Sequence, residues 1–144
     1  MHGSILEVTL HNQASEIPRA HEALDKFTAQ YRSRGQDLAL LHLAIEEHLT
    51  NVISYGYNPG QAGTIRVRFA LDGAAVRVEV EDDARPFNPL EVPEVDTSVP
   101  LEDKPIGGLG VHLVRKSVDS LRYLRAQERN VLIMTKRLVE RRAT

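Results

Sequence analysis

Glu47 and Asn51 lie four residues apart in the segment LAIEEHLTNVISYGY. At about 100° per residue, a helix through this segment places the carboxylate and the amide one turn apart on one face. The upper half of that face is apolar, with Leu40, Leu43 and Ala44. Two interpretations are open from this helix alone: the wall of a half-buried pocket that carries an acid and an amide, or a polar patch that faces another loop.

A second candidate site is the glycine-rich run Gly107-Gly108-Leu109-Gly110, which precedes a segment with helical spacing. Glycines let a backbone approach a ligand closely, and unpaired N–H groups at the start of a helix attract anions. The run therefore predicts phosphate binding, although it is equally compatible with a simple connection between elements. It differs from a Walker A loop, because the pattern GxxxxGK[ST] is absent.

Asp82 stands at the end of an alternating apolar stretch, where the chain is expected to leave a sheet. A carboxylate at this position can accept a hydrogen bond from the exocyclic amine of adenine. The other interpretation is an aspartate that initiates a turn, which is a common role for this residue type. Each of the three features is modest alone, whereas their order and spacing together are much more specific.

One short strand and a helix are predicted before the segment that carries Glu47. Residues 5–10 alternate between apolar and polar side chains, as in a half-covered strand. A helix then extends from an N-cap at Ser15 to about Arg34, and Gly35 is expected to end it.

The helix that carries Glu47 is predicted from Asp37 to about Gly56. Its core-facing stripe consists of five apolar side chains at helical spacing: Leu38, Leu41, Ile45, Leu49 and Val52. Glu46 lies on a third face with His42 and Thr50, and this face is expected to contact solvent.

Two alternating segments, 64–71 and 76–81, lie on either side of Asp72-Gly73 and predict a β-hairpin with one buried face. Residues 86–105 contain five prolines and no sustained period, which indicates a long loop. Two further alternating stretches, 121–126 and 130–138, predict a final hairpin.

The resulting order of elements is β-α-α-β-β-loop-α-β-β, in which hairpins dominate. This order predicts an α+β fold, a two-layer α/β sandwich with a mainly antiparallel sheet and helices on one face. The chain has 144 residues, so residues 1–144 are expected to form a single domain.

Composition excludes several classes of protein. The net charge of −2 gives no basic surface for direct nucleic-acid binding, and the absence of cysteine excludes disulfides and thiolate metal sites. No apolar run reaches the length of a membrane span, and the N-terminus lacks a signal pattern. A cytoplasmic protein without a membrane partner is therefore expected.

Three motifs carry a resemblance to a known family: E-x-x-x-N on a helix, D-x-A-x-P-F-N-P after a strand, and P-I-G-G-L-G-V-H-L-V-R-K leading into a helix. They resemble the N, G1 and G2 boxes of the GHKL ATP-binding superfamily. Within it the chain is similar, over nearly its whole length, to the small anti-sigma serine kinases of bacterial partner-switching systems. The fold that this resemblance implies is the Bergerat sandwich.

The resemblance also implies the roles of individual residues. Glu47 matches the general base, Asn51 the Mg²⁺ ligand and Asp82 the acid that binds adenine. The remaining residues expected to bind ATP are Ala84, Pro86, Gly107, Gly108, Leu109, Gly110 and, as a weaker match, Asn130. A lid from about residue 88 to 106 is expected to close over ATP.

The function implied is that of an ATP-dependent protein-serine kinase and anti-sigma factor. Its partners would be an antagonist protein of the STAS type, a sigma factor and, as an open question, a second copy of the chain. One alternative is a sequestration module whose nucleotide site is weak or vestigial. It is favoured by Ala84, which replaces a glycine of the family pattern and would strain or narrow the pocket if that position required a positive φ or if the adenine ring packed on bare backbone there.

Overall fold

The computed structural model describes residues 5–31, 35–91 and 108–138 of the chain. Five strands form one sheet in the order β1-β2-β3-β5-β4, and every neighbouring pair is antiparallel. The strands are β1 (Ile5–His11), β2 (Thr64–Asp72), β3 (Ala75–Asp82), β4 (Ser120–Ala126) and β5 (Arg129–Arg137). The helices are α1 (Ile17–Thr28), α2 (Gly35–Tyr55) and α3 (Gly108–Ser117).

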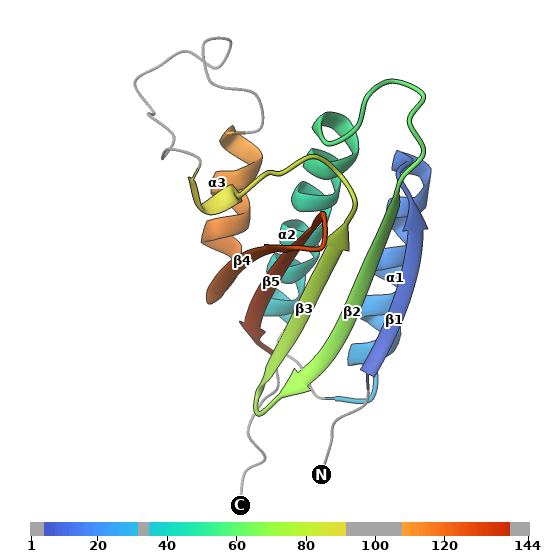
Figure 1. Cartoon of the computed structure of the whole chain (residues 1–144). Helices are drawn as coiled ribbons and strands as arrows, with labels where there is room; N and C mark the ends of the chain where they lie inside the picture. Colours follow the sequence, from blue (N-terminus) through green and yellow to red (C-terminus); the bar gives the residue numbers. More distant parts are fainter. Residues whose placement is uncertain (1–4, 32–34, 92–107, 139–144) are drawn as a thin grey trace, which may run out of the picture.

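The three helices lie on one face of the sheet, with α2 in the middle (Figure 1). The core lies between the two layers, because side chains alternate along each strand and only one set of them meets the helices. Val76, Val78 and Val80 of β3 are fully buried there and belong to the same core cluster as Leu41 and Ile45 of α2. The α+β two-layer arrangement predicted above is confirmed.

The apolar patterns of the sequence correspond closely to the buried side chains. Four residues of the α2 stripe are buried, and Leu38 packs against the same core. The hairpin of β2 and β3 turns at Gly73, which has a φ of +62° that glycine adopts without steric cost. No helix within the described residues is long and apolar enough to cross a membrane.

The boundaries of α1 differ from the prediction. Ser15 does not cap α1, because it lies in a short 3-10 turn, Ala14–Glu16, and α1 begins at Ile17 with Pro18 in its first turn. Gly35 does not end α1 either; it is the first residue of α2. A glycine between two helices fits either position, because it has no Cβ to restrict the backbone.

The face of α2 that carries Glu46 was expected to contact solvent, and it does so only in part: Thr50 is exposed and 47% of the Glu46 side chain is exposed, whereas His42 is largely covered. Glu46 and His42 face α1 and form a chain of hydrogen bonds with it. His21 Nε2 lies 2.8 Å from Glu46 Oε1, the Nδ1 atoms of His21 and His42 are 2.8 Å apart, and His42 Nε2 lies 2.8 Å from Asp25 Oδ1. This series of hydrogen bonds joins α1 to α2, so Glu46 belongs to an interhelical contact.

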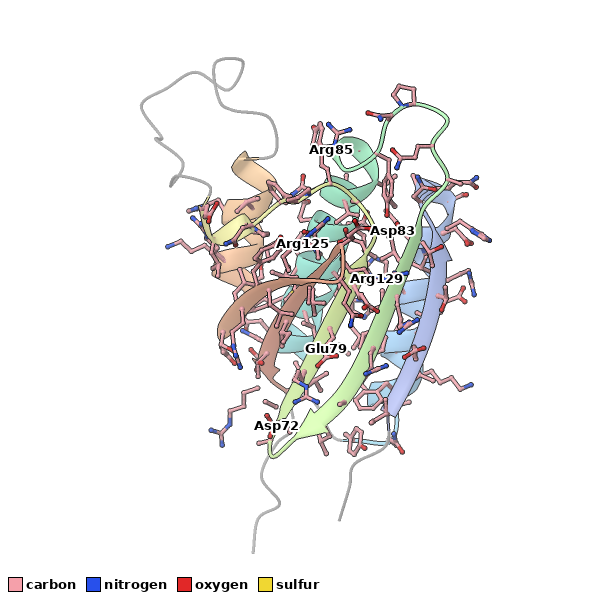
Figure 2. The ribbon with its side chains drawn as sticks, in the orientation of Figure 1. Asp72, Glu79, Asp83, Arg85, Arg125 and Arg129 are labelled. Atoms are coloured by element: carbon pink, nitrogen blue, oxygen red, sulfur yellow. The ribbon has the colours of Figure 1, made fainter. Side chains whose placement is uncertain are left out.

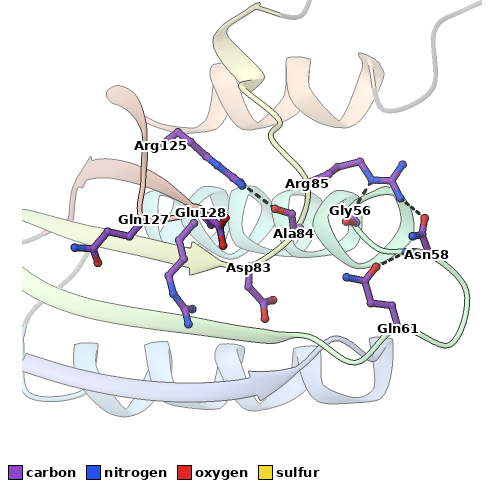
Figure 3. A pocket seen from close by; sticks show the side chains of 10 residues that line it. Gly56, Asn58, Gln61, Asp83, Ala84, Arg85, Arg125, Gln127 and Glu128 are labelled. Carbon is purple, nitrogen blue, oxygen red and sulfur yellow. Dashed lines mark hydrogen bonds between the residues drawn. The ribbon is translucent and has the colours of Figure 1, made fainter.

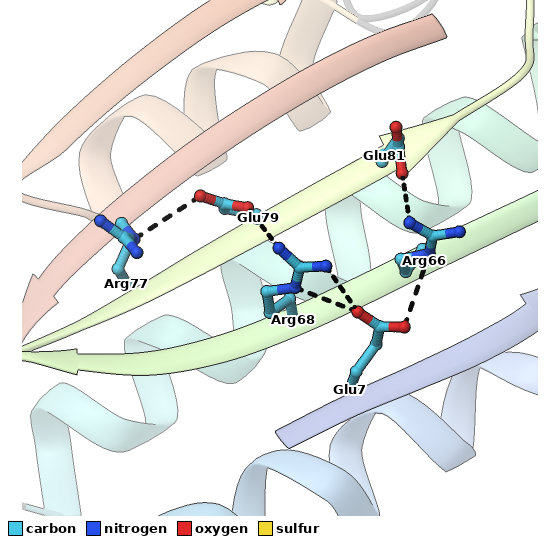
Figure 4. A network of polar contacts seen from close by, with 6 residues as sticks. All are labelled: Glu7, Arg66, Arg68, Arg77, Glu79 and Glu81. Carbon is cyan, nitrogen blue, oxygen red and sulfur yellow. Dashed lines mark hydrogen bonds and ion pairs between the residues drawn. The ribbon is translucent and has the colours of Figure 1, made fainter. Parts of the chain in front are cut away.

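The opposite face of the sheet carries alternating charges (Figure 4). Glu7 of β1 accepts hydrogen bonds from Arg68 of β2 at 2.8 and 3.0 Å, and Arg66 pairs with Glu81 of β3 at 3.2 Å. These side chains are about half exposed, so each pair contributes little to stability. The charges keep this face hydrated and leave the candidate chemistry to the helical side and the ends of the strands.

Candidate functional site

Glu47 and Asn51 face α3, the helix that packs against α2. Gly110, in the first turn of α3, lies directly opposite both side chains. A Cβ at Gly110 would be 3.1 Å from Glu47 Oε2, 3.1 Å from Asn51 Nδ2 and 3.4 Å from Asn51 Oδ1. The tertiary structure thus brings together the acid, the amide and the last glycine of the GGLG run.

The start of α3 offers backbone N–H groups on the same side of the molecule. Gly108 and Leu109 belong to the first turn of α3, so the helix begins within the GGLG run rather than after it. Unpaired N–H groups in such a turn attract phosphate. Gly107 and the expected lid, apart from residues 88–91, lie outside the described residues.

A cavity of about 160 Å³ extends from Asn51 towards the ends of β3 and β5. Most of the surface that lines it is apolar, and its polar groups are few. The lining residues are His48, Asn51, Val52, Tyr55, Gly56, Asp82, Ala84, Arg85, Pro86, Phe87 and Asn130. An apolar cavity with a few convergent polar groups is typical of a small-molecule site.

Asp82 ends β3 inside this cavity and is almost fully buried. The antiparallel register of β3 and β5 places Asn130 directly opposite Asp82, and Asn130 Nδ2 donates to Asp82 Oδ1 at 2.8 Å. The backbone N–H of Ala84 donates to the same oxygen at 3.1 Å. Asp82 Oδ2 has no partner among the described residues, so it is the oxygen that a ligand can approach.

The pKa of Asp82 is raised above its usual value, mainly because burial disfavours the charged form. The hydrogen bonds from Asn130 and Ala84 act in the opposite direction. Its neighbour Asp83 points to the other side of the strand, where it accepts a hydrogen bond from the Tyr57 hydroxyl at 2.7 Å. Of these two aspartates, only Asp82 therefore lines the cavity.

Asn130 holds the segment that follows β3. Its Nδ2 donates to Arg85 O at 2.9 Å as well as to Asp82, and its Oδ1 accepts from the backbone N–H of Phe87 at 3.3 Å and from the Tyr123 hydroxyl. Asn130 and Asp82 are both buried, so loss of the bond between them would leave Asp82 Oδ1 with the Ala84 N–H alone.

We expect Asn130→Ala to lower the free energy of unfolding by about 2–3 kcal/mol, because one buried side chain and several partly buried groups lose a partner at once. Urea denaturation at pH 7 measures this change. Asn58→Ala is the matched control, since Asn58 is exposed and accepts a single bond from Arg85, and we expect it to change stability by less than about 0.5 kcal/mol. Equal effects of the two variants would contradict the role of Asn130.

Ala84 fits its position without backbone strain. Positive φ angles occur among the described non-glycine residues at Gln127 and Glu128, and Ala84 is not among them. Its methyl group packs against Gly56, where an added Cβ would lie 2.7 Å from Ala84 Cβ and 2.5 Å from Val52 O. The missing side chain at Gly56 accommodates the methyl group, so the strain considered from the sequence does not arise.

A second, open and polar hollow adjoins the cavity (Figure 3). Arg85 crosses it and donates to Asn58 Oδ1 at 3.0 Å, and Arg125 Nη1 donates to Ala84 O at 2.9 Å. These arginines gather with Asp83 and Arg129 at the end of the sheet (Figure 2). Arg85 and Arg125 donate hydrogen bonds to the carbonyl oxygens of Gly56 and Ala84, and these bonds fix the backbone at the rim of the cavity.

His48 is a residue of this cavity that the sequence motifs did not single out. It follows Glu47 on α2, is 3% exposed, and burial lowers the pKa of its imidazole to about 4. A helical wheel could have indicated it, because His48 lies one turn after Ala44, which shares the face of Glu47 and Asn51. Tyr55, Gly56 and Phe87 were also missed, since each belongs to the cavity only through tertiary packing.

The lowered pKa of His48 predicts a pH-dependent stability. Between pH 6.5 and about 4 the unfolded chain binds a proton at this residue and the native protein does not, so stability falls as pH falls through this window. The loss reaches the order of 3 kcal/mol near pH 4. Denaturation of the wild type and of His48→Leu between pH 7 and pH 4 measures it. We expect a smaller loss in the variant; parallel curves would contradict the prediction.

The residues present fit a magnesium ion held jointly with phosphate. Asn51 is buried, and its Oδ1 lies beside Gly110 at the start of α3, 3.4 Å from the position of a Cβ on that glycine. The same part contains no group of three or more histidines and acids that could hold a metal by themselves. Magnesium keeps several waters and often takes one or two protein oxygens plus phosphate, for which the Asn51 amide oxygen is suitable.

The fold is a two-layer α/β sandwich, and its cavity is of the kind that binds a small molecule. Residues 10–136 match the model of the histidine kinase-like ATPase domain, and the chain belongs to this family.

Two protein kinases from bacteria are similar to this chain in sequence. The serine/threonine-protein kinase BtrW of Bordetella bronchiseptica is 26% identical over 66% of this chain and 67% of its own length. The serine-protein kinase RsbW of Halalkalibacterium halodurans is 30% identical over 69% of this chain and 62% of its own length. The chain is thus a distant homologue of these kinases and spans about two thirds of their length.

The fold also matches a solved structure. A crystal structure of the RsbU and RsbW domains of Rv1364c from Mycobacterium tuberculosis superposes with a TM-score of 0.68 over 96% of this chain and 33% of the other, at 21% identity. The match confirms the Bergerat-type fold expected from the resemblance.

Proposed function

We propose that this protein is an ATP-dependent protein-serine kinase and an anti-sigma factor, which phosphorylates a STAS-type antagonist and sequesters a sigma factor. One observation carries the kinase part: Glu47 and Asn51 lie side by side opposite Gly110, next to a cavity that ends at Asp82. The homology to RsbW and BtrW supports the choice of a serine as the acceptor.

Each group in this arrangement has a separate task. Asp82 Oδ2 accepts a hydrogen bond from the exocyclic amine of adenine, and the backbone at the start of α3 holds phosphate. Asn51 supplies an amide oxygen for Mg²⁺. When bound, Mg-ATP supplies the phosphoryl group and most of the charge neutralisation that its transfer requires. Glu47 orients the attacking serine hydroxyl and accepts its proton.

The absence of a side chain at Gly110 is part of this mechanism. A hydroxyl that reaches Glu47 must pass close to α3, and a Cβ at Gly110 would already touch both Glu47 and Asn51. The glycine therefore leaves room for the reacting groups between the two helices.

The test combines binding and chemistry. We expect millimolar Mg-ATP to raise the melting temperature, because a ligand that binds only the folded state stabilises it. Incubation with Mg-ATP and a STAS-type antagonist encoded near this protein should then yield phosphoserine on the antagonist, measured by mass spectrometry. Stabilisation without phosphoserine would favour a nucleotide-dependent sequestration module, and no stabilisation would favour a vestigial site.

A further inference from the structure

His48 Nε2 is a buried polar atom that has no hydrogen-bond partner in the part of the chain that the structure describes, and the tasks assigned above do not use this residue. Three buried side-chain atoms in the described residues make no hydrogen bond: His48 Nε2, Asn51 Nδ2 and Arg77 Nε. Arg77 Nε still lies 3.6 Å from a Glu79 carboxylate oxygen. The other two atoms belong to residues that line the same cavity.

Such a group is costly when the cavity holds no ligand. An unpaired polar atom loses its bonds to water on burial and gains none in return, whereas a leucine of similar size would avoid this cost. A buried unsatisfied group in a native protein therefore calls for an explanation, such as a functional role or a water, ion or ligand that completes it. Asn51 already has an assigned role, because its amide oxygen is proposed to hold the metal, whereas His48 has no role so far.

The chemistry of the imidazole restricts what the partner can be. Burial lowers the pKa of His48 to about 4, so the ring is neutral at physiological pH and offers one N–H donor and one acceptor nitrogen. A neutral ring in a largely apolar cavity does not favour phosphate, which selects cations and backbone N–H groups. It suits an uncharged polar edge, such as that of a nucleobase.

We propose that His48 determines base specificity by donating a hydrogen bond to a ring nitrogen of the purine whose exocyclic amine is bound by Asp82. The proposal rests on the proposed nucleotide site and adds a second polar contact to it. Adenine presents ring nitrogens as acceptors beside its amine donor, so one donor and one acceptor from the protein match its edge. Asp82 Oδ2 is the acceptor and His48 the donor.

The first measurement compares ADP binding to the wild type and to His48→Leu by calorimetry at pH 7.5. We expect an affinity loss of about tenfold, the usual worth of a neutral hydrogen bond at a buried site. The melting temperature of the ligand-free variant should equal or exceed that of the wild type, because the unpaired polar atom is gone. A residue with a structural role only would lower stability instead.

The second measurement identifies the contact on the base. We expect one of 1-deaza-, 3-deaza- and 7-deaza-ADP to bind the wild type about tenfold more weakly than ADP, and to show no such loss with His48→Leu. This is the coupling expected when both changes remove the same hydrogen bond. Independent losses for all three analogues would overturn the base contact.

Nitrogen-15 NMR of the wild-type histidines keeps the proposal testable if His48→Leu does not fold. ADP should shift the resonances of the His48 ring, and inorganic triphosphate should not. Unchanged resonances with bound ADP, or wild-type affinity in the folded variant, would overturn the role of His48 and leave the nucleotide site intact. A wild type that binds no ADP would overturn the site itself.

Discussion

Glu47→Gln is expected to reduce phosphorylation of the antagonist by roughly 10²-fold or more, the usual worth of a general base. The glutamine keeps the shape of the side chain and its hydrogen-bonding capacity, but it cannot accept a proton. Because the base acts mainly in the transition state, ATP affinity should remain within a few-fold of the wild type. Single-turnover phosphorylation and equilibrium titration with ATP measure the two quantities separately.

Glu22→Gln is the matched control, because Glu22 is an exposed glutamate of α1 and does not line the cavity. Glu46 cannot serve this purpose, since its carboxylate lies 2.8 Å from His21 and connects two helices. Sequestration of the sigma factor should survive Glu47→Gln. Full phosphorylation by the Glu47 variant would leave the proposed kinase without its mechanism.

Asp82→Asn is expected to weaken binding of ADP by about 10- to 100-fold in the absence of magnesium, the range for a hydrogen bond to a charged group. The asparagine oxygen can still accept from Asn130 and Ala84. Its NH₂ group then takes the place of Oδ2 and meets the amine of adenine, donor against donor. Calorimetric titration measures the loss.

Two further measurements, one on Asp82→Asn and one on Asn51→Ala, show whether the loss of binding comes from the lost contact with the base. The pKa of Asp82 is raised by burial, so removal of its charge should leave the stability of the ligand-free protein unchanged or higher at pH 7. Asn51→Ala should weaken ADP binding only when magnesium is present. A variant Asp82→Asn that binds ADP like the wild type would show that the carboxylate does not contact the base.

Periodic segments of the sequence were sufficient to predict most of the fold. The alternation from Thr64 to Asp82 defines a hairpin, because only an extended chain places every second side chain on one face. The last hairpin was predicted as well, but its turn at Gln127 and Glu128 has φ angles of 53° and 63° without glycine or asparagine to indicate it. Helix ends were less predictable, since Gly35 fits the end of one helix as well as the start of the next.

The sequence by itself determined that Glu47 and Asn51 share one face of α2, because local helical geometry fixes residues four apart. It also determined the outline of the motifs that resemble the ATP-binding family. Only the tertiary structure decided which groups meet: the packing of α3 on α2 puts Gly110 against Glu47 and Asn51, and the register of β3 and β5 puts Asn130 opposite Asp82. Likewise, Glu46 contacts α1, and His48 Nε2 is buried without a hydrogen-bond partner among the described residues, because burial depends on elements that are distant in the chain and leave no signal in local spacing.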